Sequence, residues 1–157
     1  MKMQRGFTLV ELMITVAIVG VLVSMAVPAK EMVVKREKER VLRASLREIR
    51  SALDAYKRAV DEGKVKTDLG ETGYPKSLDD LVRGVENISA PDHKKIYFLR
   101  RLPSDPMQAD TSLPAASTWG KRSYASSPEE PQEGADVFDV YSKASGRGIN
   151  GIAYQDW

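Results

Sequence analysis

The stretch FTLVELMITVAIVGVLVSMAV, residues 7–27, decides what kind of protein this is. Its only charged side chain is that of Glu11. As a helix the stretch is about 32 Å long, which matches the hydrocarbon core of a bilayer. Lys2 and Arg5 precede it and favour a cytoplasmic amino end. We therefore expect residues 7–28 to form a transmembrane helix, with the rest of the chain on the far side of the membrane.

Composition limits the function classes. The chain has 157 residues, enough for one modest domain beside a membrane segment. The formal net charge of +2 falls to zero without residues 1–6, which carry Lys2 and Arg5, so we expect no nucleic-acid partner. The absence of cysteine excludes disulfides and thiolate chemistry. With one histidine, His93, in a polar stretch, and no phosphate-binding loop, the sequence offers no catalytic constellation and predicts that the protein is not an enzyme.

The acid inside the apolar stretch needs an explanation. A charged side chain at the bilayer centre costs on the order of 3 kcal/mol. A cleaved secretory signal peptide, with small residues near Val27–Ala29 as its cleavage site, is one alternative, and a plain membrane anchor is another. Neither explains Glu11.

The amino terminus resembles a known processing signal. A short basic leader ending in Gly6, followed by FTLVELMITVAIVGVL, is similar to the class III signal of type IV pilins and type II secretion pseudopilins. The resemblance implies that a prepilin peptidase removes residues 1–6 by cutting between Gly6 and Phe7, and then methylates the new amino group of Phe7. Because the cut precedes the apolar segment, the helix is retained.

This processing would supply Glu11 with a partner. In a bundle of subunits the carboxylate can pair with the ammonium of Phe7 on a neighbouring subunit. At about 4 Å and an effective dielectric near 20 the pair is worth roughly 4 kcal/mol before desolvation is subtracted. A subunit out of register would leave a buried charge unpaired. We therefore predict that Glu11 and Phe7 form an assembly site.

Beyond the membrane segment the pattern becomes amphipathic. Pro28 lacks a backbone donor and predicts a kink. Residues 29–61 are expected to continue the helix into the head, because apolar residues recur at helical spacing, namely Leu42, Leu46, Ile49, Leu53, Tyr56 and Val60. The charged residues around this stripe allow two interpretations. They form either a basic face for DNA or anionic lipid, or a surface of ion pairs in which Glu31, Glu37, Glu39 and Glu48 alternate with basic residues. The interleaving favours the ion pairs.

Residues 62–157 are predicted to form a small globular head. Ser77, Asp80 and Gly84 mark the cap, the capping partner and the end of a short helix. KRSYASS and DVFDVYS alternate polar and apolar residues, which predicts an antiparallel sheet. GYPKSLDDLV, LPSDP, WGKRSY and DVFDVYS also resemble major pseudopilins of type II secretion more than type IV pilins, which frequently carry a disulfide.

Major pseudopilins resembling this chain often bind calcium in the loop after the last long strand. The corresponding stretch here, SKASGRGING, has Ser145 and no acid between Asp139 and Asp156, whereas calcium prefers six to eight oxygen ligands that include carboxylates. Asp156, Ser142 and backbone carbonyls are the alternative ligands for a weak site between Ser142 and Asp156. We expect no metal and no other cofactor, and predict a loop held by hydrogen bonds that involve Arg147.

The expected fold is therefore α+β and type IV pilin-like, with a long amino-terminal helix packed on a head with a short helix and a small sheet. The resemblance implies a structural subunit, anchored in the bacterial inner membrane with a periplasmic head. Such subunits polymerise into a periplasmic pseudopilus that drives export of folded proteins. Its partners would be other copies, other pseudopilins, the prepilin peptidase and the inner-membrane assembly platform. The alternatives are a type IV pilin or minor pilin for adhesion, motility or DNA uptake, and a single-span binding protein that does not polymerise.

Overall fold

The computed structural model describes residues 7–157, without the side chains of residues 25–29. The predicted leader 1–6, with Gly6, lies outside the described residues. The elements are α1 (Leu9–Asp61), α2 (Leu78–Arg83), β1 (Val85–Glu86), β2 (Lys95–Ile96), α3 (Ala115–Thr118), β3 (Trp119–Arg122), β4 (Asp139–Ser142) and a 3-10 helix, η1 (Tyr154–Asp156). Long and short helices with small antiparallel sheets confirm the α+β class. The chain divides into two units. The first ends at Glu37, and the second begins at Lys38.

The first unit contains the amino-terminal part of α1. Every side chain from Phe7 to Ser24 is exposed, including the apolar ones on all sides of the helix. Within the described residues, no helix has an apolar segment long enough to cross a membrane. The chain is helical through Pro28, and the kink there stays a prediction.

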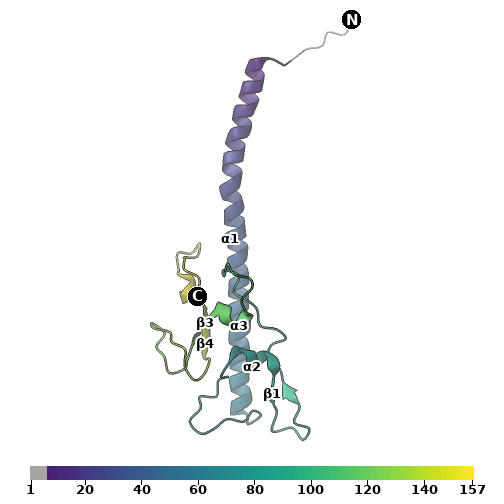
Figure 1. The fold of residues 1–157 in the computed structure, drawn as a ribbon, viewed down its shortest axis with the longest axis vertical. Coiled ribbons are helices and arrows are strands. Elements are labelled where there is room, and N and C mark those ends of the chain that lie inside the picture. The colour runs from purple at the N-terminus through teal and green to yellow at the C-terminus, as the bar shows by residue number, and fades with distance from the viewer. Residues whose placement is uncertain (1–6) are drawn as a thin grey trace. The chain divides into compact units, whose positions relative to one another are not determined.

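The second unit is built on one face of α1. Leu42, Leu46, Ile49 and Leu53 are buried, which confirms the predicted apolar stripe, and Tyr56 and Val60 continue it as half-buried side chains. Other elements complete this core with Leu78, Leu81, Trp119 and Val140. Figure 1 shows α2 crossing the carboxyl-terminal part of α1, with β3 and β4 beside it.

Helix α2 has the predicted boundaries. The Ser77 hydroxyl accepts a hydrogen bond from the Asp79 amide (3.2 Å), and the Asp80 carboxylate accepts one from the Ser77 amide (3.0 Å). Together these bonds form a capping box. At the other end Gly84 has φ 72°, a conformation that favours glycine. Capping residues alone were therefore sufficient to place this helix.

The sheets are smaller than predicted, and one of them was missed. β3 pairs with β4 antiparallel, as predicted for this pair of segments. However, KRSYASS is not a strand beyond Arg122, because the chain turns at Ser123, whose carbonyl accepts a hydrogen bond from the Ser126 amide (3.1 Å). DVFDVYS becomes a strand only at Asp139. The two-residue strands β1 and β2 form a second antiparallel pair that alternation in so short a stretch could not reveal.

The LPSDP segment is connected to the β3–β4 sheet by hydrogen bonds. The buried Asp105 carboxylate accepts hydrogen bonds from the Ser142 hydroxyl (2.5 Å) and the Met107 amide (2.8 Å), and the Asp105 amide donates to the Thr118 hydroxyl (3.0 Å). The Trp119 indole N–H donates to the Pro103 carbonyl (2.8 Å). An irregular, proline-containing segment is thereby held in place by side-chain hydrogen bonds.

The stripe on α1 generates a stability prediction. Leu42 is fully buried, so Leu42→Ala should lower the free energy of unfolding by about 2–5 kcal/mol through lost burial and an unfilled cavity. Val41, its exposed neighbour, provides the control, and Val41→Ala should change stability by less than about 0.5 kcal/mol. The measurement is urea unfolding of the full chain in detergent, followed by tryptophan fluorescence. Equal losses in the two variants would contradict the assigned core face.

Candidate functional site

The described residues contain no cluster of three or more histidine, cysteine, aspartate or glutamate side chains that could hold a metal ion. Two polar arrangements remain as candidates for function. One is at the start of α1, around Glu11. The other is a cleft between α1 and the carboxyl-terminal segment, within the second unit.

At the start of α1, Glu11 caps its own helix. The Glu11 amide donates to the Thr8 hydroxyl (3.2 Å), and the Glu11 carboxylate accepts from the Thr8 amide at 3.5 Å, a long hydrogen bond. This is the reciprocal pattern of a capping box. TLVE has the spacing of a capping box, but the apolar residues on both sides of it are typical of a membrane segment and obscure this local signal. Phe7 is exposed, and its pairing with Glu11 of another copy stays a prediction.

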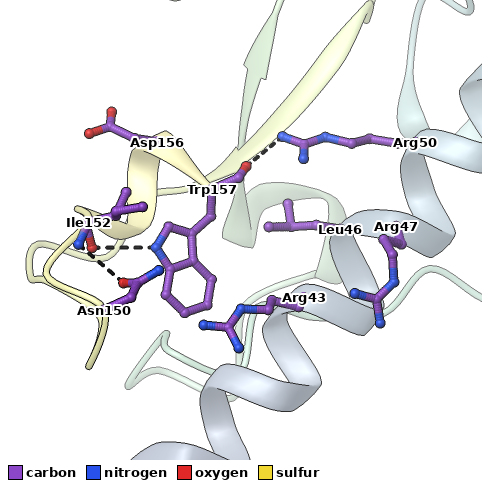
Figure 2. Close-up of a pocket in the computed structure, with 8 residues that line it drawn as sticks. All are labelled: Arg43, Leu46, Arg47, Arg50, Asn150, Ile152, Asp156 and Trp157. Carbon is purple, nitrogen blue, oxygen red and sulfur yellow. Dashed lines mark hydrogen bonds between the residues drawn. The ribbon is translucent and has the colours of Figure 1, made fainter.

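Three arginines on successive turns of α1 line the cleft, which has a volume of about 300 Å³. They are Arg43, Arg47 and Arg50, and Figure 2 shows Arg43 beside the Trp157 indole and Arg50 directed at the Trp157 carbonyl oxygen. Ile152 and Asn150 complete the opposite wall. The Trp157 side chain is half-buried here and packs against the core of the head.

Arg50 links three parts of the head. Its Nε donates to Asp139 Oδ1 (2.7 Å), and its Nη2 donates to the carbonyl oxygens of Val140 (3.0 Å) and Trp157 (2.8 Å). One guanidinium thus holds α1, β4 and the carboxyl-terminal segment together. The planar guanidinium of arginine, with its several donors, is better suited to this role than the ammonium group of lysine.

The other two arginines differ in their environment. The Arg43 guanidinium carbon lies 4.2 Å from the centre of the Trp157 ring, a cation–π contact. Arg43 also forms an ion pair with Glu39, at 3.8 Å. The Arg47 side chain has no hydrogen bond or ion pair with any residue that the structure describes.

Glu39 is the largest departure from the sequence-based expectation. It was placed in an exposed surface of ion pairs, but only 3% of it is exposed. Its Oε1 accepts hydrogen bonds from the Ile149 amide (2.9 Å) and the Tyr154 hydroxyl (3.1 Å). Burial and the hydrogen bond to Glu39 raise the pKa of Tyr154. The predicted ion pairing at i,i+4 spacing is present, with Arg43, but the predicted exposure was wrong, because both donors lie more than 100 residues away along the chain, beyond any local pattern.

The loop after β4 is closed by its own hydrogen bonds. The Arg147 guanidinium donates to the Gly151 carbonyl (2.9 Å), and the Gly148 amide donates to the Ile152 carbonyl (2.8 Å). The predicted involvement of Arg147 is confirmed. Ser142, suggested as an alternative metal ligand, instead donates its hydroxyl to Asp105. Figure 2 shows the Asp156 carboxylate pointing away from the indole.

The Arg50 contacts generate a second prediction. Arg50→Lys retains the charge but cannot reproduce a fork of three hydrogen bonds, so it should reduce the free energy of unfolding by about 1–3 kcal/mol. Arg47→Lys, on the same face and without a partner among the described residues, should change it by less than about 0.5 kcal/mol. Urea unfolding of both full-length variants tests the difference, and similar stability of the two would refute the linking role of Arg50.

Comparisons with known proteins agree with the motifs. Residues 1–27 match the prokaryotic N-terminal methylation motif. The chain is 34% identical over 121 residues to type II secretion system core protein G of Klebsiella pneumoniae, an alignment that covers 72% of this chain and 76% of the relative. It is 30% identical over 141 residues to the protein of the same name from Klebsiella michiganensis, covering 85% of this chain and 89% of the relative. Its identity to the Dickeya chrysanthemi protein of that name is 29% over 124 residues, covering 76% and 74%. No solved structure matches the chain.

These relatives belong to type II secretion, as the amino-terminal signal and the head motifs suggested for this chain, and the alignments extend over most of each protein. The chain belongs to the family of type II secretion system core protein G, the major pseudopilins.

Proposed function

We propose that this pseudopilin polymerises into a periplasmic filament that drives folded proteins through the outer membrane, and that Glu11 sets the register of its subunits. The observation that carries the proposal is a helix that is apolar on all sides, exposed in the single chain, and interrupted by one acid close to its start. A helix of this kind requires apolar surroundings on every side.

Two environments can supply these surroundings in turn. Before assembly, residues 7–28 would span the inner membrane, with the amino end in the cytoplasm and the head in the periplasm. Lys2 and Arg5 support this orientation. After assembly, the same segments of neighbouring copies would pack against one another. Gly20 supports close packing, because a Cβ at this position would meet nothing within the single chain and its absence leaves room for another helix.

The capping box explains how Glu11 is tolerated before assembly. Its carboxylate is engaged with the Thr8 amide, but through a bond of 3.5 Å that is easily exchanged. In the filament the ammonium of Phe7 from the next copy would offer a full positive charge in apolar surroundings, where an ion pair is stronger than in water. The carboxylate would thus move from an intramolecular to an intermolecular partner.

Processing must come first, because the amino group of Phe7 exists only after cleavage. We assign the removal of residues 1–6 and the methylation of Phe7 to a prepilin peptidase, and subunit addition to the inner-membrane assembly platform, together with other pseudopilins. The match of residues 1–27 to the methylation motif supports this assignment. No catalytic or nucleic-acid-binding role is proposed for the chain itself.

Processing is directly measurable. Protein purified from membranes should begin at Phe7, carry a methyl group on its amino nitrogen and contain 151 residues, the 157 of the precursor less the 6 of the leader. Amino-terminal sequencing and intact mass determine all three. A chain that begins after residue 27 would contradict the proposal, because the helix and Glu11 would then be lost.

The role of the charge is tested by Glu11→Gln. Glutamine can replace glutamate in a capping box, so the helix start should persist, but the partner for an ammonium is lost. We expect membrane insertion at the wild-type level and at least about a tenfold loss of filaments, as for removal of a charged hydrogen bond worth roughly 1.5–3 kcal/mol. Filaments are counted by electron microscopy of sheared cells that overproduce the subunit.

Glu130→Gln is the matched control, since this exposed acid lies in the head. It should assemble normally. Wild-type filament numbers from Glu11→Gln would mean that the carboxylate acts only as a helix cap.

A further inference from the structure

The resemblance to major pseudopilins implies a calcium ion in the loop after β4, and the residues of this chain do not fit one. The Ser142 hydroxyl, the alternative ligand named above, is engaged elsewhere, since it donates to Asp105 and accepts from the Ala144 amide (3.2 Å). Asn150 Oδ1, a further oxygen of this loop, accepts from the Ile152 amide (3.1 Å). The loop instead contains the fixed positive charge of Arg147. A divalent cation would have to compete with that charge and lacks the carboxylates it prefers.

We propose that the buried carboxylate of Glu39 takes the place of the cation, so that the carboxyl-terminal segment of this pseudopilin is ordered without calcium. Glu39 is on α1, and its two hydrogen-bond donors belong to the loop and to η1. The carboxylate therefore joins the three elements at one atom, Oε1.

The polarity of the loop is the opposite of that in a calcium site. A cation gathers oxygen atoms, whereas a carboxylate gathers N–H and O–H donors. Here the Ile149 amide and the Tyr154 hydroxyl donate to Glu39, and the Gly151 carbonyl accepts a hydrogen bond from Arg147. The anion on the helix and the cation in the loop are both provided by the chain.

The burial of Glu39 makes this contact specific. A buried charge is tolerated only when it is paired and hydrogen-bonded, and Glu39 has two donors on one oxygen and Arg43 near the other. Hydrogen bonds to a charged acceptor are about twice as strong as neutral ones. A segment that moved away would leave this carboxylate buried without its donors.

The contact extends to the wall of the cleft. The Tyr154 ring packs against the Trp157 ring, with centroids 5.2 Å apart. A Cβ on Gly148 would lie 2.3 Å from the Trp157 ring, so the loop approaches the indole too closely for any other residue at this position. Loss of the Glu39 contact should therefore release the loop and Trp157 together.

The experiment uses the processed full-length chain in detergent, and it combines thermal unfolding with trypsin digestion. Arg147 is the only Lys or Arg between residues 144 and 157, so a cut there releases a defined carboxyl-terminal peptide that mass spectrometry detects. In the wild type we expect the same melting temperature and the same slow cleavage with added calcium and with a calcium chelator. Glu39→Ala should speed cleavage after Arg147 by at least about tenfold, since it removes two charge-assisted hydrogen bonds.

Glu48→Ala is the matched control on the same helix, because Glu48 is exposed and should leave the cleavage rate unchanged. Two results would overturn the proposal: a wild-type loop that is protected by calcium and released by the chelator, or a Glu39→Ala loop that is cut no faster than the wild type. If Glu39→Ala does not fold, Tyr154→Phe removes one donor and should still speed cleavage severalfold. Because each readout concerns the isolated subunit, the result does not depend on filament formation.

Discussion

Burial of one face of α1 is the constraint on which the head depends. Leu42, Leu46, Ile49 and Leu53 form the surface against which α2 and the β3–β4 sheet pack. The sheet has only two short strands, and such a pair is not stable alone in water. Apolar contact with α1 and the side-chain hydrogen bonds around Asp105 therefore provide the stability that the short strands lack.

The polar residues beside this stripe give α1 a second role. Glu39 and Arg50 lie about three turns apart on the same side of it, and each binds backbone groups far away in the chain. Apolar packing is not directional, so it alone leaves the carboxyl-terminal segment free to shift. A carboxylate and a guanidinium with defined donors and acceptors restrict it to one arrangement.

Local patterns allowed much of this structure to be predicted. The stripe on α1 follows from helical periodicity, and the ends of α2 follow from Ser77, Asp80 and Gly84, because both signals act within a few residues. The predictions failed where the interaction was distant or the element very short. Glu39 has the local spacing of a surface ion pair, and nothing near it in the sequence reveals Ile149 or Tyr154 as its donors. Strands of two residues, such as β1, are too short to show an alternating pattern.

The two acids that matter most on α1 are subject to the same rule in different surroundings. A carboxylate removed from water needs donors, and the position of the donors decides what it does. Glu39 finds both within its own chain, so its effect is complete in a single subunit. Within residues 7–157, the Glu11 carboxylate accepts one long hydrogen bond, from the Thr8 amide, and the surfaces around it are apolar and uncovered. In the proposed filament another copy would supply its stronger partner, so Glu39 stabilises the fold of the single subunit whereas Glu11 would be required for assembly.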